Sequence, residues 1–575
     1  MVEAGQTWGR GLEWDVVRTV LADEARTALG RERAVTAQPL TDIGGVQAAI
    51  DMTGQARQAL GAAGPPPLDA IVDIRPILDR ARLRGAVLDG TELVQILPAV
   101  EASPKLAAYG RGVQEGSPVL GRLMGALPRA PELRDALRRA LDDDGAVTDQ
   151  ASSRLGQLRR GMRERRRRIV SELERMLQSV ESASDRFVTV RHGRYVIPLR
   201  IDARNRVRGI VHDRSQSGGT VFVEPEAVID ANNELAEMVR AEEQEVLRIL
   251  ADLTDRVRGR IEDLSTLMEA IGEIDWIFCR AHLGERMNAS APAMDTEQIV
   301  SLSAARHPLL LVQSWKDPAR PVVPVDLSLS RQRPLLLVTG PNAGGKTIAL
   351  KTLALCALMA QVGCHLPVAD GARLPVFDGV FAIVGDDQSV ANNLSTFSAF
   401  VKQVREIFEV VDERSLVLLD ELGAGTDPDE GAALAQAILE ELAARGVLVM
   451  ATTHLEPLKA FASTSVQARN ASMEFDSVTL APTFRLLYDR PGQSYALAIA
   501  ARLGLASELV ARAHAHRSAQ GVRMSELLER LDAHARSEAE RAITIERREE
   551  EAAMRLEAAR QAEASAETRA RAALA

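Results

Sequence analysis

Apolar residues recur at helical spacing through most of the first 290 residues of the chain. Between 152 and 183 this spacing becomes a heptad, and a second long helical run covers about 227–268. We predict two long helices, 151–184 and 226–290, that pair as an antiparallel arm. The apolar positions of the heptad are Leu155, Met162, Ile169 and Met176, with Leu173 and Val180 on the alternate seam.

The tip segment, residues 185–225, has a different character. It is rich in β-branched residues, and His192-Gly193 and Ser217-Gly218-Gly219 are turn signals. Short strands are therefore predicted between the two helices. A segment of this size buries little apolar surface by itself.

Residues 295–515 alternate between strand and helix patterns, which predicts an α/β domain with a mostly parallel sheet. Apolar runs at Pro334–Val338 and Val447–Ala451 are typical of buried strands. Residues 1–150 are predicted to form a helical core. Residues 516–575 are charged and alanine-rich, which indicates a helical tail or linker.

Net charge, cysteine count and the lengths of apolar runs limit the classes of function that the chain can have. A net charge of −10 over 575 residues argues against a generally basic surface, so any nucleic-acid contact must come from a local patch. Three scattered cysteines are too few for a disulfide framework or a zinc cage. We find no signal-peptide pattern and no run of apolar residues that could span a membrane, so we expect a cytoplasmic protein.

A phosphate-binding loop follows the apolar run Pro334–Val338 and has the pattern G-x-x-x-x-G-K-[ST]. A strand, a glycine-rich loop and a helix N-terminus direct backbone N–H groups onto phosphate oxygens. Lys346 is predicted to reach the β- and γ-phosphates of ATP, and the Thr347 hydroxyl to bind Mg²⁺. The predicted nucleotide-binding residues of the loop are Gly340, Pro341, Asn342, Ala343, Gly344, Gly345, Lys346 and Thr347.

Two acids, Asp420 and Glu421, end a second apolar run about 75 residues later. Carboxylates at the end of a buried strand are costly unless they serve a metal or a proton. We predict that Asp420 holds the Mg²⁺ and that Glu421 deprotonates the attacking water.

His454 closes the next predicted strand, after Thr452-Thr453. A lone histidine is usually a core or surface residue. At the end of a neighbouring parallel strand, however, it points to the same edge of the sheet. We therefore predict a contact with the γ-phosphate, and we name Lys346, Glu421 and His454 as catalytic.

These residues carry a resemblance to the ATPase domain of the MutS family, a relative of ABC-type ATPases. The segments around 194–198 and 209–225 resemble its second branch, which lacks the mismatch-reading domain. The motifs that carry the resemblance are TGPNAGGKT at 339–347, NLSTFSAF at 393–400, DELGAGTDPDEGAALA at 420–435 and TTHLEPLK at 452–459, with Arg306-His307-Pro308 ahead of them.

The resemblance implies a homodimer with two composite ATP sites. Each phosphate-binding loop would be completed by Ser395 and Thr396 of the partner, which are therefore added to the nucleotide-binding set. Gly425-Thr426 would lie at the dimer contact, and Ser494–Ala515 resembles a helix-turn-helix that braces the dimer.

Two departures from the wider family limit the expected function. The 339 residues ahead of the loop leave no room for the mismatch-reading domain, so mismatch recognition is not expected. The second branch usually carries a C-terminal Smr nuclease module, and this chain stops at Ala575. A nuclease site of the D…[DE]-x-K type needs a lysine two residues after an acid, and none of the six lysines has one.

The tip segment is rich in cations, and the resemblance places it at the family's nucleic-acid clamp. Arginine binds phosphates through its bidentate fork. The alternative is solvated charge with internal ion pairs. The predicted contacts are Arg191, Arg194, Arg200, Arg204 and Arg214.

Together these patterns predict an ATP-hydrolysing dimeric clamp on nucleic acid. The resemblance links this branch both to suppression of recombination and to rescue of collided ribosomes. The partner would thus be branched or double-stranded DNA, or ribosomal RNA. A third possibility is a dimeric scaffold in which ATP only switches assembly. We favour branched DNA or recombination intermediates, although the sequence does not separate this target from the ribosome, because both need a basic tip on a long arm.

Overall fold

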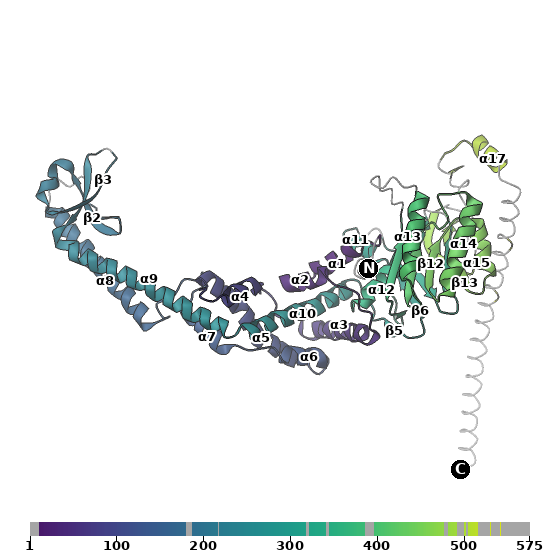
Figure 1. Ribbon diagram of the computed structural model, residues 1–575, viewed down its shortest axis with the longest axis horizontal. Coiled ribbons are helices and arrows are strands. Elements are labelled where there is room, and N and C mark those ends of the chain that lie inside the picture. The colour runs from purple at the N-terminus through teal and green to yellow at the C-terminus, as the bar shows by residue number, and fades with distance from the viewer. Residues whose placement is uncertain are drawn as a thin grey trace, which may run out of the picture. The chain divides into compact units, whose positions relative to one another are not determined.

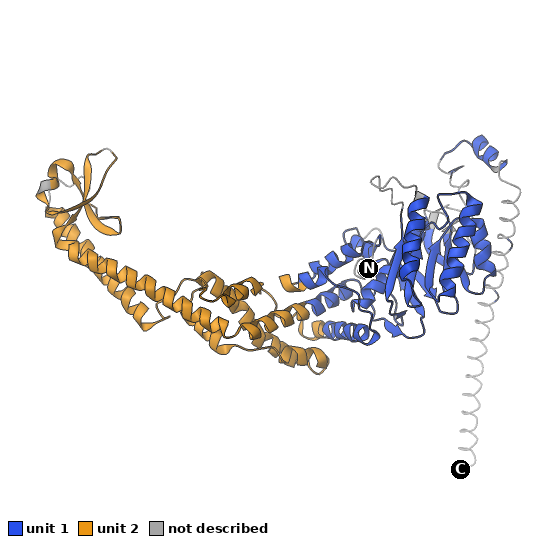
Figure 2. Ribbon diagram, viewed as in Figure 1, with its two compact units in different colours: residues 1–25, 31–58, 276–575 blue, residues 26–30, 59–275 orange. Residues whose placement is uncertain are grey.

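The computed structural model divides into two compact units, shown in Figure 2. It describes residues 11–179, 187–216, 218–317, 321–340, 344–385, 396–476, 481–490, 500–501, 504–515, 530 and 541. Unit 1 comprises residues 1–25, 31–58 and 276–575, and unit 2 comprises 26–30 and 59–275. No helix in the described part of the chain combines the length and apolar character that crossing a bilayer requires.

Unit 2 is built from helices apart from a small sheet (Figure 1). The start of α5 shows how the sequence sets an element boundary. The Asp89 carboxylate accepts the N–H of Glu92, and the Glu92 carboxylate accepts the N–H of Asp89, which forms a capping box. The helices that lie within the unit are α4 (Arg75–Arg82), α5 (Gly90–Val113), α6 (Pro118–Gly125), α7 (Pro131–Ala140), α8 (Ser153–Ser179) and α9 (Ile229–Arg258).

Helices α8 and α9 lie side by side and form the arm of unit 2 (Figure 1). The heptad side chains Leu155, Met162 and Ile169 are buried along α8, as are Leu173 and Leu177. Helix α9 ends at Arg258, and α10 (Ile261–Arg286) begins three residues later. The long helical run expected over 227–268 is therefore interrupted. The break falls at Gly259, the C-cap of α9, where glycine weakens a helix.

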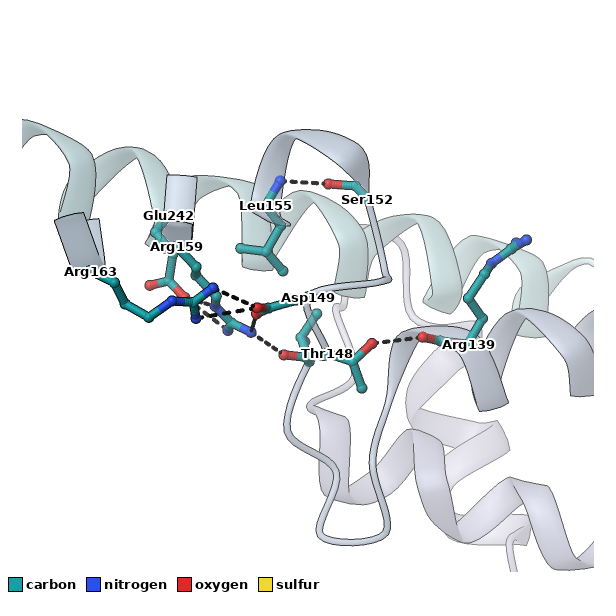
Figure 3. A network of polar contacts seen from close by, with 9 residues as sticks. Arg139, Thr148, Asp149, Ser152, Leu155, Arg159, Arg163 and Glu242 are labelled. Carbon is teal, nitrogen blue, oxygen red and sulfur yellow. Dashed lines mark hydrogen bonds and ion pairs between the residues drawn. The ribbon is translucent and has the colours of Figure 1, made fainter. Parts of the chain in front are cut away.

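A network of polar side chains fixes the start of α8 (Figure 3). The Arg159 guanidinium donates to Asp149 at 3.0 Å, to Glu242 of α9 at 2.9 Å and to the Val147 carbonyl at 2.7 Å. The hydroxyl of Ser152 accepts the N–H of Leu155 and so caps the first turn of α8. Charged groups therefore hold the start of α8 to the preceding loop and to α9. They add to the apolar contacts between α8 and α9.

At the end of the arm, the tip folds as a four-stranded antiparallel sheet in the order β1-β2-β4-β3 (Figure 1). Its core is small, as Ile197, Leu199, Val221 and Val223 pack against α8 and α9 residues including Leu173. Packing on the helices provides the burial that the tip segment alone lacks. Its elements are β1 (Thr189–Arg191), β2 (Arg194–Arg200), η2 (Ile201–Arg206), β3 (Gly209–Arg214), β4 (Thr220–Pro225) and η3 (Glu226–Val228).

Unit 1 contains a six-stranded sheet in the order β10-β11-β12-β8-β13-β14, in which only the β13–β14 pair is antiparallel. Successive residues of β8 enter different cores, because strand side chains alternate between faces. Leu336 and Val338 pack with α12, and Leu335 and Leu337 pack with α13–α15. The strands are β8 (Leu335–Thr339), β10 (Gly379–Ile383), β11 (Ser415–Leu419), β12 (Leu448–Thr452), β13 (Ala468–Asp476) and β14 (Ala481–Tyr488).

The remaining elements of unit 1 are helices and a second sheet in the order β5-β9-β6-β7. The strands of this sheet are β5 (Ala293–Asp295), β6 (Val300–Ala305), β7 (Val325–Leu329) and β9 (Arg373–Pro375). The helices are α1 (Trp14–Asp23), α11 (Pro308–Ser314), α12 (Lys346–Gln361), α13 (Thr396–Val410), α14 (Pro428–Ala444), α15 (Glu456–Thr464) and α17 (Ser507–Ala515).

Helix α12 ends in a turn at Gly363 that contacts the unit 1 parts of two other helices. The Thr53 hydroxyl of α3 (Ile43–Ala63) donates to the Gly363 carbonyl at 2.6 Å, and Arg280 of α10 donates to the Val362 carbonyl at 3.0 Å. A Cβ on Gly363 would lie 2.1 Å from the Arg280 guanidinium, and φ there is +82°. Only glycine fits this close approach.

The first 150 residues, predicted as one helical core, are distributed over both units. Helix α1 and most of α3 belong to unit 1, while α4–α7 belong to unit 2, and α2 (Ala28–Val35) has residues in each. Helical periodicity does not indicate which core a helix joins, because it gives only the face that is buried. Of the predicted tail 516–575, the described part is residues 530 and 541, so the rest of that prediction lies outside the described residues.

Candidate functional site

The phosphate-binding loop joins β8 to α12. Gly345, immediately before the helix, has φ of +91°, and Gly340 has φ of +123°, so both glycines adopt backbone conformations that other residues disfavour. Gly344 is buried beside them. Pro341, Asn342 and Ala343 lie outside the described residues. The first turn of α12 thus follows directly from a glycine-rich loop, which is the geometry that binds phosphate at a helix N-terminus.

Lys346 is 2% exposed, and its ammonium donates to the Gly340 carbonyl at 2.5 Å. Burial lowers the pKa of this ammonium, while Glu421 and Asp420 act in the opposite direction. A buried cation in contact with the backbone of the loop is suited to an anion of high charge.

Thr347 and Asp420 meet at the edge of the sheet. The Thr347 hydroxyl donates to Oδ2 of Asp420 at 2.7 Å. Both side chains present oxygen atoms next to the Lys346 loop, and hard oxygen donors are the ligands that Mg²⁺ prefers. The donor set therefore fits a magnesium ion bound together with phosphate oxygens.

Glu421 follows Asp420 in an unusual backbone conformation. Its φ is +51°, in the left-handed region, and its side chain is exposed. Non-glycine residues in this region are uncommon, and they persist where the surrounding structure fixes them. The conformation turns the chain at Glu421, two residues after β11 ends at Leu419.

Thr452, at the end of β12, contacts both acids and was not among the predicted residues. Its hydroxyl accepts the N–H of Glu421 at 2.8 Å and donates to Oδ1 of Asp420. The hydroxyl doublet Thr452-Thr453 ahead of His454 was the signal that could have indicated this role, since small polar residues rarely end a buried strand without a partner.

His454 lies two residues beyond β12 and is exposed. Strands β8, β11 and β12 are parallel neighbours, so their carboxyl ends meet at one edge of the sheet. This arrangement places His454 at the same edge as Lys346, Asp420 and Glu421. Its contact with a γ-phosphate stays a prediction.

A cavity of about 380 Å³ lies beside the loop. Phe484 of β14 is a wall of this cavity, and its ring packs over Gly345, where an added Cβ would lie 3.1 Å from the ring. His307, also in the wall, stays neutral because burial lowers its pKa to about 4. Phe484 was missed because it lies nearly 140 residues beyond the loop. Other lining residues are Val322, Val323, Ile348, Thr352 and Met473.

Of the two residues expected to complete the ATP site of a partner chain, one is among the described residues. Ser395 lies outside the described residues, and Thr396 is the first residue of α13. Gly425 has φ of +85° in the turn that follows Glu421. Within the predicted helix-turn-helix, α17 is described, while 494–499 and 502–503 lie outside the described residues.

The tip arginines fall into two groups. Arg194 pairs at 2.9 Å with Glu224, a buried carboxylate that also accepts Nε2 of His212 at 2.6 Å and the Asn232 amide at 2.8 Å. Arg191 pairs with Asp213 and stacks over the Phe222 ring. These two arginines therefore hold the tip together.

The second group is exposed. Arg200 pairs loosely with Asp202 at 3.4 Å, and its side chain is 63% exposed. Arg204 of η2 and Arg214 of β3 are also exposed. Neither of them forms an ion pair with an acid in the described part of the chain. Their guanidinium groups face solvent, where a phosphate backbone could reach them.

Residues 336–520 match the family model described as MutS domain V. The chain is 40% identical over 524 residues to a protein of Pelotomaculum thermopropionicum named endonuclease MutS2. It is 39% identical over 514 residues to endonuclease MutS2 of Halalkalibacterium halodurans.

These alignments cover most of the present chain but not the whole of the relatives. They include 91% and 88% of this chain and 66% and 64% of the respective relative. The chain thus spans just under two thirds of the length of the relatives that it matches. The matched family domain includes α12, both acids and His454.

Proposed function

Because the chain belongs to the MutS2 family and carries its ATPase domain, we propose that it works as a dimeric, ATP-hydrolysing clamp on nucleic acid. The observation that carries the proposal is the convergence of Lys346, Thr347, Asp420 and Glu421 at one edge of a parallel sheet. Phosphoryl transfer needs a cation for the phosphates and a carboxylate for the water, and this edge provides both.

Binding of ATP uses the groups that the loop presents. The backbone N–H groups at the start of α12 and the Lys346 ammonium hold the β- and γ-phosphates. Thr347 and Asp420 are the residues that would hold Mg²⁺. When bound, the ion neutralises charge on the phosphate oxygens.

Hydrolysis requires a water in line with the γ-phosphate and a base that takes its proton. Glu421 is the candidate, because it is exposed and directly follows Asp420. Its carboxylate would accept a proton from the water as the new P–O bond forms and the β–γ bridging bond breaks. His454 would donate a hydrogen bond to a γ-phosphate oxygen and so stabilise the charge that develops there.

The cavity beside Gly345 is proposed to hold the adenine base, with Phe484 stacked on it. Replacing Phe484 with alanine should weaken ATP binding about three- to tenfold, because aromatic stacking contributes about 0.5–1.5 kcal/mol beyond buried area. Titration with a fluorescent ATP analogue checks the change.

A matched pair of ligands makes this test specific. Inorganic tripolyphosphate has the phosphates but no base, so its affinity should be the same in Phe484→Ala and in the unaltered protein. Phe484→Tyr keeps the ring and should bind ATP almost normally. Equal losses for ATP and tripolyphosphate would assign Phe484 to the loop and not to the base.

Dimerisation is proposed to complete each ATP site with Ser395 and Thr396 of the partner. Glu421 and His454 are both exposed in the single chain, so a second copy could cover them. Covering the site would exclude bulk water and strengthen its electrostatic contacts. ATP binding would then close the dimer, and hydrolysis would reopen it.

Nucleic-acid binding is proposed for the exposed arginines of the tip. Replacing Arg204 and Arg214 together with alanine should weaken binding about equally for all sequences. The slope of log affinity against log salt should fall by roughly 2 if each guanidinium neutralises one phosphate. Fluorescence anisotropy at several salt concentrations measures both quantities.

The control is a double variant with the same loss of charge elsewhere in unit 2. Arg84 and Arg129 are exposed residues of the α4–α5 and α6–α7 loops, and Arg84→Ala with Arg129→Ala should leave the salt slope unchanged. Arg191 and Arg194 are unsuitable for this test, because their removal would disturb the tip itself. An unaltered slope in the Arg204–Arg214 variant would exclude these residues as phosphate contacts.

Two targets fit an arginine-rich tip on a long arm. We favour branched DNA or recombination intermediates, whose binding would suppress recombination, and rescue of collided ribosomes through ribosomal RNA is the alternative. The deciding measurement is the ATPase rate with branched DNA, with duplex DNA and with stalled ribosomes. Stimulation by one of them identifies the target. If none stimulates the rate, an ATP-switched scaffold replaces the clamp.

A further inference from the structure

We infer that Thr452 is a positioning residue for ATP hydrolysis, and that its hydroxyl fixes Asp420 and Glu421 relative to each other. The inference rests on the proposed function, because it concerns the same phosphate site. Thr452 does not contact the reacting atoms in this scheme. It acts through the two acids that do.

The contacts of Thr452 are concentrated on three consecutive residues. Its hydroxyl accepts the N–H of Glu421 at 2.8 Å and donates to Oδ1 of Asp420. Its backbone carbonyl accepts the N–H of Leu422 at 2.8 Å. One fully buried residue at the end of β12 therefore holds the side chain of one acid and the backbone of the other.

This arrangement explains how the left-handed backbone at Glu421 persists. A φ of +51° is disfavoured for glutamate, so the fold must hold the residue there. The hydrogen bond from the Glu421 N–H to the Thr452 hydroxyl fixes one side of this residue, and the bond from Leu422 fixes the other. Without the hydroxyl, the Glu421 amide loses its acceptor and the carboxylate loses its fixed direction.

The same hydroxyl sets the orientation of Asp420. Oδ2 of Asp420 accepts the hydroxyl of Thr347, and Oδ1 accepts the hydroxyl of Thr452. The carboxylate is thus held by one threonine at each oxygen, and loss of either would allow it to rotate. Catalysis is sensitive to such rotation, since misplacement of a catalytic group by about 1 Å can reduce a rate by roughly 100-fold.

The neighbouring Thr453 shows that burial alone does not give this role. Its hydroxyl donates to the Leu422 carbonyl at 3.0 Å and accepts the N–H of Leu455 at 3.1 Å. Both partners are backbone groups outside the pair of acids. Of the two adjacent threonines, Thr452 is the one whose hydroxyl joins Asp420 to Glu421.

The test replaces Thr452 with valine, which keeps the β-branched shape and removes the hydroxyl. We expect kcat for ATP to fall about tenfold or more, since a single lost orienting hydrogen bond has an effect of this order. KM and the affinity for a fluorescent ATP analogue in EDTA should stay within about twofold, because Lys346 and the loop are unaltered. Thr452→Ser should restore most of kcat.

Two further variants exclude a general loss of stability. Thr53→Val removes another fully buried hydroxyl, which bonds the Gly363 carbonyl away from the acids, and its kcat should be unchanged. Thr452→Ala also lacks the hydroxyl and leaves more space in the strand, so it replaces the valine variant if that one fails to fold. Thermal unfolding of each protein identifies the folded variants.

The outcomes are distinct. A folded Thr452→Val or Thr452→Ala protein with wild-type kcat, or a folded Thr452→Ser protein that is as slow as they are, would overturn the inference alone. An unaltered protein that neither binds nor hydrolyses ATP would overturn the proposed function, and the inference with it. A change in nucleotide affinity in EDTA that equals the change in kcat would assign Thr452 to binding instead of positioning.

Discussion

Replacing Glu421 with glutamine should reduce ATP hydrolysis about 100-fold or more while nucleotide affinity stays nearly unchanged. Glutamine has the size and hydrogen-bonding reach of glutamate but cannot take a proton from water, and a general base contributes about 10²–10⁴-fold to a rate. A single-turnover assay with radiolabelled ATP measures the chemical step, and equilibrium binding measures affinity.

The same variant should also reveal the assembly state. If ATP closes the dimer and hydrolysis reopens it, Glu421→Gln with ATP should remain dimeric in size-exclusion chromatography, whereas the unaltered protein returns to its resting state. Glu413→Gln is a matched control, because Glu413 is an exposed acid that pairs with Arg331 at the surface. Normal hydrolysis by Glu421→Gln would show that another group takes the proton.

The second large effect is expected at Lys346. Replacing it with alanine should weaken ATP binding about 100-fold or more. The ammonium is buried, so water could not take over its contact with the phosphates after the substitution. Isothermal titration with ATP and with ADP checks the result. The loss should be larger for ATP, which also has the γ-phosphate.

Lys351 offers the control for charge. It lies five residues further along α12, and its ammonium pairs with Glu13 at 2.7 Å. Lys351→Ala removes the same charge from the same helix and should bind ATP normally. If both variants lost affinity equally, the effect would come from the stability of α12 and not from a contact with phosphate.

The phosphate site could be predicted from sequence because its chemistry is local. The loop at 340–347 has glycines and a lysine at fixed spacing after an apolar strand, and Asp420-Glu421 directly follow another. Each of these two motifs spans fewer than ten residues. Both follow strands of one parallel sheet, and the carboxyl ends of parallel strands lie at the same edge, so no knowledge of other contacts is needed to bring the motifs together. The family match confirms that this region is a MutS-type ATPase domain.

What the sequence did not show depends on contacts between distant segments. Thr452 contacts residues about 30 positions earlier, and Phe484 reaches Gly345 through the position of β14 in the sheet. The same reason explains Arg194: its charge is visible in the sequence, but its buried partner Glu224 is 30 residues away. Charge patterns therefore gave the composition of the tip but not which arginines remain exposed.

Helix periodicity was similarly informative only in part. The heptad of α8 correctly indicated Leu155, Met162 and Ile169 as buried. The run over 227–268 kept helical spacing across Gly259, so the pattern did not show the break between α9 and α10. A single glycine lowers helix stability by about 1 kcal/mol, which the spacing of apolar residues does not record.

The turn at Gly363 has a mechanical consequence. Helix α12 begins at Lys346 and ends at this turn, which Thr53 of α3 and Arg280 of α10 contact. Both helices have residues in each unit, since unit 2 takes in 59–63 of α3 and 261–275 of α10. Helix α12, with 16 residues and a length of about 24 Å, therefore runs from Lys346 to a turn that is anchored within unit 1 at its far end.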